Sequence, residues 1–434
     1  MRAAEVTYSH TLERRQTLKR HLCLLAAALG ISTAAMAEPV SILFIGNSYT
    51  FGRLDPVMSY NAANVHDLTA GFNAISSTGT NPWEPHPWGG VPGIFKKFTD
   101  QSGLDYDVSI SARNAASLRG QFLNTANAAW DLRGNAASRT WNTVVLQEQS
   151  DAALPAGRGR NADQATFNAY ADQFERYIHV GAAQSYTEAQ LFGSLAACQA
   201  TGSSATTCNT VRNIPANPNA SATTKIYLTQ TWARPDMVFA HKITRADPTT
   251  SDGRPIVDTT SAGGNAILYY GSLAAMTADL RDSFAAKAST NPRFAGVLPV
   301  GEAFQLAVDR GLVKGSGFYD ANGVYVPNPP GGPMNLWWDD YLHASKYGSY
   351  LDALVQFGMI TGLSPLSLGP NEQAALDLGI SSTDAATLQR IAADQLAIAA
   401  IPEPSTWALL AGGLVLVGRF AQRRARREAE APTH

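Results

Sequence analysis

Two short motifs at opposite ends of the chain carry side chains that together could perform nucleophilic catalysis. Ser48 follows an apolar run, residues 40–45, and a Gly-Asn turn, whereas Asp340 and His343 lie three residues apart just before an expected helix. A carboxylate that accepts a hydrogen bond from one imidazole nitrogen fixes the tautomer of the ring. The other ring nitrogen can then take a proton from a serine hydroxyl. These residue types are compatible with a serine nucleophile that has His343 as its base and Asp340 as the acid that orients the base.

Each motif also has a plain structural interpretation. Ser48 could be a polar residue in an ordinary turn, and Asp340 could cap a helix beside a packed histidine. Between the expected processing segments the histidines are His66, His86, His179, His241 and His343. Only His343 has an acid at this spacing beside a helix start. The alternative of a metal-dependent hydrolase that uses His66, Asp67 and His86 is not supported by any sequence motif. No metal or cofactor is expected.

The elements that must position these residues follow a strand–helix alternation. The run 40–45 is nearly continuous and apolar, which suits a strand buried on both faces of a parallel sheet. Ligand sites of such sheets gather at the carboxyl ends of the strands, where Ser48 stands. Further strands are expected at 106–110, 141–151, 225–233 and 294–300, and helices at 94–101, 163–182, 268–288, 302–310, 346–360 and 384–399. The pattern predicts a three-layer α/β/α domain with a five-stranded parallel sheet.

The early Gly46-Asn-Ser48 and the late Asp340-Tyr-Leu-His343 together resemble the SGNH (GDSL-type) hydrolase superfamily. The resemblance covers about residues 38–365 and implies a flavodoxin-like α/β domain. It also implies Ser48 as the nucleophile, His343 as general base and then acid, and Asp340 as the partner that orients His343. The Gly-Asn-Ser form of the first motif, in place of Gly-Asp-Ser, occurs in part of the superfamily.

The resemblance further implies an oxyanion hole, in which the first donor is the Ser48 N–H. The second motif normally supplies a glycine N–H, but this chain has Asn114-Ala-Ala116 there. A backbone donor survives an added methyl group if φ stays negative, so we expect the Ala115 N–H, with Ala116 as the alternative.

The third motif departs from the superfamily pattern as well. The superfamily has Gly-x-Asn, whose asparagine side chain is the third donor, whereas this chain has Gln147-Glu-Gln149. A glutamine amide can donate from one methylene further away, so Gln149 is the expected donor and Gln147 the alternative.

Substrate-binding residues are expected in the Pro- and Trp-rich loop 81–90, next to Ser48, and at the end of the strand expected at 225–233. Trp83, His86 and Trp88 could line a cleft or pack as a surface loop, and both interpretations stay open. Asn47 and Trp232 are the other candidates. Aromatic faces suit sugar rings, so we expect an ester, an O-acetyl or short acyl group, with extracellular polysaccharide as its carrier. A lipid or simple acyl ester is one alternative. A non-catalytic exported matrix or carbohydrate-binding protein on the same scaffold is the other.

Composition limits the possible partners. The chain has 434 residues, 16% of them charged, and its middle part, residues 38–401, holds 23 basic and 30 acidic side chains, a net charge of −7. Nucleic acid is excluded as a partner, because it calls for a basic patch. In an exported protein, Cys198 and Cys208 are expected to form a disulfide across a flexible Ser/Thr-rich insertion, residues 193–220. No Cys/His cluster indicates zinc.

The two ends of the chain are expected to be targeting signals that are not part of the folded domain. Residues 1–37 have a basic start, a short apolar run and an Ala-x-Ala site, which predicts a signal peptide cut by signal peptidase. Residues 401–427 resemble the PEP-CTERM sorting signal, with Pro402-Glu-Pro404, an apolar segment and an arginine cluster. The resemblance implies export from a Gram-negative bacterium to the periplasm, cell surface or matrix, and cleavage by an exosortase-like enzyme after transient membrane contact. A plain C-terminal anchor is the alternative. Residues 38–400 then form the hydrolase domain, with a terminal helix at 384–399, and residues 428–434 form a tail.

Overall fold

The computed structural model of the chain describes residues 38–71, 84–125, 129, 131–261, 264–329 and 331–399. The chain divides into two units, Met1–Pro39 and Val40–His434, and the architecture below concerns the second. The predicted signal peptide, the sorting segment, the tail and Trp83 lie outside the described residues. Within the described ranges, no helix is both long and apolar enough to cross a membrane.

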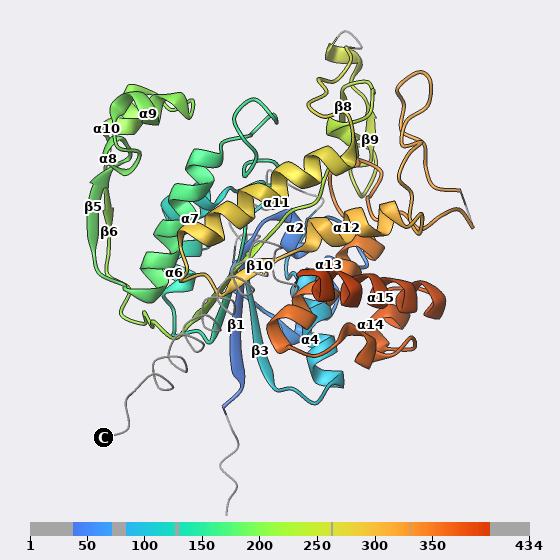
Figure 1. The fold of residues 1–434 in the computed structure, drawn as a ribbon, viewed down its shortest axis with the longest axis horizontal. Coiled ribbons are helices and arrows are strands. Elements are labelled where there is room, and N and C mark those ends of the chain that lie inside the picture. The colour runs from blue at the N-terminus through green and yellow to red at the C-terminus, as the bar shows by residue number, and fades with distance from the viewer. Residues whose placement is uncertain are drawn as a thin grey trace, which may run out of the picture. The chain divides into compact units, whose positions relative to one another are not determined.

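A six-stranded parallel sheet forms the centre of the fold, in the order β2-β3-β1-β4-β7-β10 (Figure 1). The strands are β1 (Val40–Gly46), β2 (His66–Asp67), β3 (Tyr106–Ala112), β4 (Thr143–Gln147), β7 (Lys225–Thr229) and β10 (Gly296–Leu298). Without β2 the order is that of a flavodoxin-like doubly wound sheet. The predicted α/β class is confirmed, but the sheet has six strands and not five. The two residues of β2 are too short to leave an apolar run in the sequence.

Helices cover both faces of the sheet. On one face α4 packs against α13, which packs in turn against α12 and α15, and on the other α5 and α7 lie together with α11 (Figure 1). The main helices are α2 (Ser48–Phe51), α4 (Gly90–Gln101), α5 (Leu118–Leu123), α6 (Leu132–Ala136), α7 (Gln164–His179), α11 (Leu273–Thr290), α12 (Val300–Asp309), α13 (Lys346–Thr361), α14 (Gln373–Asp377) and α15 (Ser382–Ala399). The predicted long helices are all present, with boundaries shifted by up to five residues.

The register of the sheet brings three strand ends to one edge. Residues 42–45 of β1 are buried, which follows from their apolar side chains between two helical layers. Gly46 lies opposite Ala112 of β3, and Ile45 lies opposite Leu146 of β4. The segments that follow these residues, 47–48, 113–117 and 147–150, therefore meet at the carboxyl edge of the sheet.

A disulfide-linked arm replaces the loop expected at 193–220. It begins earlier, at the antiparallel pair β5 (Gln184–Thr187) and β6 (Val211–Ile214), and carries α8 (Glu188–Leu191), α9 (Leu195–Ala200) and α10 (Ala205–Asn209) between them (Figure 1). Cys198 of α9 and Cys208 of α10 are bonded at 2.04 Å. Serine N-caps start both helices, so the Ser/Thr-rich composition that suggested a loop instead starts short helices. A second hairpin, β8 (Thr244–Ala246) with β9 (Pro255–Val257), lies within the polar region 234–264.

Asp352 on α13 is a buried carboxyl whose ionisation opposes folding. Gln356 donates to its Oδ1 at 2.7 Å, and burial raises the pKa of Asp352 to about 7. The unfolded chain ionises near pH 4, so the stability contributed by the neutral carboxyl is complete below pH 4 and is lost as pH rises through 7. We expect Asp352→Asn to raise the free energy of unfolding by about 2–4 kcal/mol at pH 8. At pH 4 the substitution should change little. Urea denaturation at both pH values measures this, and equal effects at the two pH values would contradict it.

Candidate active site

Ser48 is the first residue of α2, directly after the β1 turn, and its side chain is buried to 5% exposure. Asn47 caps this short helix, because its Oδ1 accepts the Tyr49 N–H at 3.1 Å. The turn needs a glycine before it. A Cβ on Gly46 would lie 1.9 Å from the Thr50 Oγ1 and 2.8 Å from the Gln147 Oε1. The absence of a side chain there leaves room for the Thr50 hydroxyl and the Gln147 amide next to the turn that carries Ser48.

His343 and Asp340 complete a hydrogen-bonded chain with Ser48. The Ser48 Oγ lies 2.9 Å from the His343 Nε2, and the His343 Nδ1 lies 2.6 Å from the Asp340 Oδ2. The Asp340 Oδ1 also accepts the backbone N–H groups of Leu342 and His343, at 3.0 and 2.9 Å. Burial alone would raise the pKa of Asp340, but the charge and hydrogen bonds of His343 outweigh it and hold this pKa below its usual range. An ionised Asp340 can hold the imidazole with its Nε2 directed at the serine.

The loop that carries this pair is closed on itself before α13 begins. Trp338 donates its N–H to the His343 carbonyl at 2.9 Å, and the Ser345 N–H reaches the Leu336 carbonyl at 2.9 Å. The Ser345 hydroxyl caps α13 and donates to a carbonyl of the same loop. Gly348 of α13 lets the helix approach, since a Cβ there would lie 2.2 Å from the Leu336 carbonyl oxygen. The geometry of Asp340 and His343 is therefore fixed by backbone contacts.

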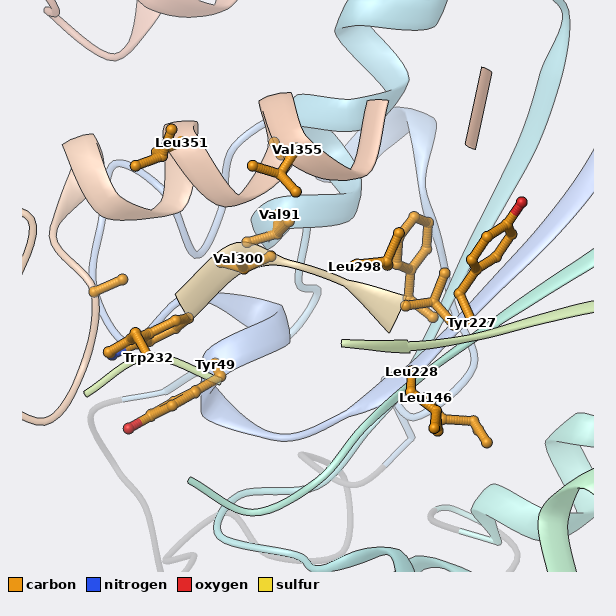
Figure 2. Close-up of a cluster of buried hydrophobic side chains, with 14 of the residues drawn as sticks. Tyr49, Val91, Leu146, Tyr227, Leu228, Trp232, Leu298, Val300, Leu351 and Val355 are labelled. Atoms are coloured by element: carbon orange, nitrogen blue, oxygen red, sulfur yellow. The ribbon is translucent and has the colours of Figure 1, made fainter. Parts of the chain in front are cut away.

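Tyr49 and Trp232 fix the same loop to the Ser48 helix. Their rings stack at 4.0 Å, and Figure 2 shows the two side chains next to each other. Both donate to the Leu342 carbonyl, from the Tyr49 OH at 2.9 Å and the Trp232 Nε1 at 3.1 Å. Trp232 is 1% exposed and stacks on Phe304 with its other face. The assignment of Trp232 to substrate binding is wrong, because its ring is enclosed. It positions the residue next to His343.

Two backbone N–H groups near Ser48 are available to bind an oxyanion. Within the described residues, neither the Ser48 N–H nor the Ala115 N–H has an acceptor. Ala115 has a φ of +53°, so the expectation of a negative φ is wrong. The backbone here keeps the left-handed conformation that suits a glycine, and the alanine accepts it at a steric cost. The Ala116 N–H bonds to the Arg113 carbonyl at 3.2 Å, which makes the alternative donor unavailable.

The strain at Ala115 gives a testable expectation. A left-handed residue with a Cβ costs roughly 1–2 kcal/mol in the folded protein, and a glycine avoids this cost. Glycine also has more conformational freedom in the unfolded chain, which offsets part of the gain in stability. We expect Ala115→Gly to raise the free energy of unfolding by about 1 kcal/mol and to retain the backbone donor. Chemical denaturation of the two proteins measures the difference. A destabilised glycine variant would contradict the assigned backbone conformation.

The third segment has one glutamine that supports the turn and one that stays a candidate donor. The Gln147 Oε1 accepts from the Asn47 N–H at 3.1 Å and from the Thr50 hydroxyl at 3.0 Å, so this side chain holds the turn beneath Ser48. The Gln149 amide donates to the Ser150 hydroxyl at 3.2 Å, and its Oε1 has no partner within the described residues. Gln149 remains the proposed third donor.

Glu148, which sequence reasoning did not single out, ties the second and third segments together. Its Oε1 accepts the N–H groups of Leu118 and Gln149 at 3.0 and 2.6 Å. Burial raises its pKa to about 8, although these two hydrogen bonds act in the opposite direction. Gln121 adds a link, since its Nε2 donates to the Gly46 and Ala116 carbonyls, each at 3.1 Å. The two candidate oxyanion segments are thus held in register.

Asn47 belongs to the same scaffold and is not free to bind substrate. Its Nδ2 donates to the Ala116 carbonyl at 3.0 Å and to the Glu148 carbonyl at 3.4 Å, and the side chain is 2% exposed. Its assignment as a substrate-binding residue is therefore wrong. The side chain joins the ends of three strands.

His86 and Trp88 pack inside the protein. The side chain of His86 is 2% exposed, its Nδ1 lies 2.6 Å from the Asp67 Oδ2, and its ring stacks on Trp88 at 3.5 Å. Trp88 is 3% exposed and stacks on Phe51 with its other face. Of the two interpretations of loop 81–90, the packed loop describes these residues, and the cleft-lining assignment of His86 and Trp88 is wrong.

A buried ion pair, which has no motif in the sequence, lies close to the triad. Arg53 Nε lies 3.1 Å from the Glu84 Oε1, and both side chains are buried. Burial raises the pKa of Glu84 to about 7, while the charges of Arg53 and His343 act to lower it. The coupling to His343 and Asp340 places this carboxyl in the electrostatic surroundings of the site.

The residues weighed for a metal site do not come together. His66 is 72% exposed in its side chain and pairs with Asp107 at 3.2 Å, away from the contact between Asp67 and His86. In the parts of the chain that the structure describes, no group of three or more His, Cys, Asp or Glu side chains is arranged to hold a metal ion.

Comparison with known proteins identifies one segment. Residues 400–427 match the model of the PEP-CTERM protein-sorting motif, which confirms the predicted sorting signal and indicates export in Gram-negative bacteria toward the cell surface or the extracellular space. No curated protein matches the chain.

Solved structures similar to this chain include a candidate SGNH hydrolase from Slackia heliotrinireducens, at 15% identity and a TM-score of 0.32, over 74% of this chain and 99% of the other. A DUF4886 family protein from Bacteroides uniformis is 11% identical with a TM-score of 0.39, over 85% and 98%. An extracellular lipase from Streptomyces rimosus is 13% identical with a TM-score of 0.29, over 74% and 99%.

Proposed function

We propose that the protein is an exported serine esterase that cleaves short acyl or O-acetyl groups through an acyl-enzyme on Ser48. The observation that carries the proposal is the chain of hydrogen bonds from Ser48 through His343 to Asp340, with distances of 2.9 and 2.6 Å. It stands at the carboxyl edge of a parallel sheet, beside two N–H groups that have no acceptor within the described residues. A serine, a base and an orienting acid at these distances can perform acyl transfer.

The chemistry follows from the geometry. His343 Nε2 takes the proton of the Ser48 hydroxyl as the Oγ attacks the ester carbonyl, and Asp340 stabilises the imidazolium that forms. The Ser48 and Ala115 N–H groups and the Gln149 amide receive the oxyanion, each donor contributing roughly 3 kcal/mol to the transition state. The imidazolium then protonates the leaving alcohol. Water, deprotonated by His343, attacks the acyl-enzyme and releases the acid and free Ser48.

The predicted location of the protein supports an extracellular ester as its substrate. The sorting motif at residues 400–427 accompanies export, so the esters it meets lie outside the cytoplasm. We propose acylated extracellular polysaccharide as the substrate. The test is hydrolysis by the purified protein of p-nitrophenyl acetate, butyrate and octanoate and of O-acetylated polysaccharide. Turnover that falls with acyl length supports the proposal, and failure on all four substrates would overturn it.

A further inference from the structure

A polar cavity opens beside the candidate oxyanion donors. It has a volume of about 440 Å³, and Ala115 and Gln149 form part of its wall. The opposite wall is the turn Thr201–Ser203, which joins α9 to α10 in the disulfide-linked arm. The cavity is far larger than an acetyl group requires, so it has room for a larger part of a substrate.

The chemistry of the lining favours a ligand rich in hydroxyl groups. Ser117, Asn161, Asp163 and Thr166 contribute polar atoms, and apolar surface, to which Phe167 and Ala152 contribute, makes up nearly half of the lining. A long acyl chain here would desolvate these polar atoms without replacing their hydrogen bonds, which costs roughly 1–3 kcal/mol for each group. A sugar presents hydroxyls that can bond to polar atoms of this lining and an apolar ring face that can pack on Phe167. Of the charged side chains in this lining, Arg119 is paired with Glu188 and Asp163 is acidic, so the lining favours a neutral sugar over an acidic one.

The arm is fastened at this position by a buried carboxylate. Glu188, at the start of α8, is 0% exposed and accepts from the Arg119 Nε at 2.5 Å and the Tyr170 OH at 2.5 Å, both of which belong to the body of the domain. Arg212 of β6 donates to the same carboxylate at 3.1 Å. Burial would raise the pKa of Glu188, but these hydrogen bonds outweigh it and lower the pKa to about 2. The anchor therefore stays charged at neutral pH.

The disulfide holds the turn that forms part of the cavity wall. Cys198 and Cys208 are buried and join α9 to α10 on either side of the turn that faces the cavity. Thr201 donates to the Cys198 carbonyl at 2.7 Å, so the turn is attached to the bonded cysteine. The arm thus presents a fixed surface to the cavity.

We propose that this cavity is a subsite for a neutral sugar unit on the alcohol side of the ester, with the disulfide-linked arm as its outer wall. The inference rests on the proposed esterase function. In this proposal the arm recognises the polysaccharide, and the residues around Ser48 bind only the acyl group.

The test compares two substrates in three variants of the full chain. Ser203→Trp fills the cavity from the arm, and Thr166→Val removes a hydroxyl from the opposite wall at nearly constant volume. Gln199→Trp is the matched control, because Gln199 is exposed on the same arm outside the cavity. The readout is the ratio of kcat/KM on chemically O-acetylated xylohexaose to kcat/KM on p-nitrophenyl acetate.

We expect the ratio to fall at least about 10-fold in Ser203→Trp and about 3-fold to 10-fold in Thr166→Val, the effect of one lost hydrogen bond, and to stay unchanged in Gln199→Trp. Turnover of p-nitrophenyl acetate by each variant shows that it has folded. Unchanged ratios in both cavity variants, or a wild-type protein that cleaves p-nitrophenyl acetate but not the acetylated oligosaccharide, would overturn the subsite. A wild type inactive on both substrates and on longer acyl esters would instead overturn the esterase function.

Discussion

Replacing Ser48 by alanine is expected to lower kcat/KM on p-nitrophenyl acetate by at least about 10⁴-fold, the scale seen when a serine nucleophile is removed. The Ser48 Oγ is the only protein atom of the proposed mechanism that bonds to the acyl carbon, and no other hydroxyl is hydrogen-bonded to His343 in the described residues. The substitution removes one oxygen from a buried position and leaves the N-cap by Asn47 in place. The fold should therefore survive.

The control for this substitution is Ser59→Ala, an exposed serine whose hydroxyl bonds to Asp55 at 2.6 Å. Its kcat/KM should equal that of the wild type. Circular dichroism and the midpoint of thermal unfolding show whether the Ser48 variant is folded. If a folded Ser48→Ala protein keeps more than about a tenth of wild-type activity, the nucleophile is another residue.

Replacing His343 by alanine is expected to have an effect of similar size, because the serine then lacks its base and the leaving alcohol lacks its acid. Residues of one triad act as a unit, so the double variant Ser48→Ala/His343→Ala should be no slower than Ser48→Ala alone. Added imidazole should restore part of the activity of His343→Ala, since the side chain it replaces is 12% exposed and solvent can reach the space. Initial rates with and without imidazole measure this.

His66→Ala is the matched control, because the side chain of His66 is 72% exposed and lies outside the site. It should retain full activity and show no response to imidazole. A His343→Ala protein that remains as active as His66→Ala would rule out His343 as the base, and a further large loss in the double variant would place the two residues in separate steps.

The parts of the fold that sequence could predict are those with local patterns. The buried run of β1 and the Gly-Asn-Ser turn lie together in sequence, and so do Asp340 and His343, so their roles in the geometry could be inferred from short stretches. Strand β2 has two residues and no apolar run, which is why the sixth strand was missed. Loop composition at 193–220 gave no sign of the hairpin and helices of the arm, since their pairing depends on residues 184–187 outside that stretch.

The wrong assignments around the site share one cause. Trp88 and Trp232 are predicted to bind substrate because aromatic faces suit sugar rings, and Asn47 because it precedes Ser48, whereas long-range contacts bury all three. Trp232 and Tyr49 both donate to the Leu342 carbonyl, which is almost 300 residues from Tyr49 in the chain. A local sequence pattern cannot predict such a contact. The pairs Arg53–Glu84 and Arg119–Glu188 likewise bring together residues from separate elements.

The sign of φ at Ala115 is a different kind of error. Alanine favours negative φ, which predicts a relaxed turn, but Ala115 is left-handed in a segment whose neighbours Ala116 and Leu118 are bonded to Asn47 and Glu148. The proposed donor thus has a backbone conformation that a glycine adopts without steric cost. Tertiary constraint, and not local preference, decides the backbone of the second segment.

Covalent labelling by a fluorophosphonate probe, with the modified residue identified by mass spectrometry, tests the central claim most directly. The reagent phosphonylates a serine only when a base and oxyanion donors activate it, so it separates an esterase from a non-catalytic binding protein on the same scaffold. We predict stoichiometric labelling of Ser48 in the folded protein, and none in His343→Ala. A folded wild-type protein that stays unlabelled, or that is labelled at another serine, would contradict the account.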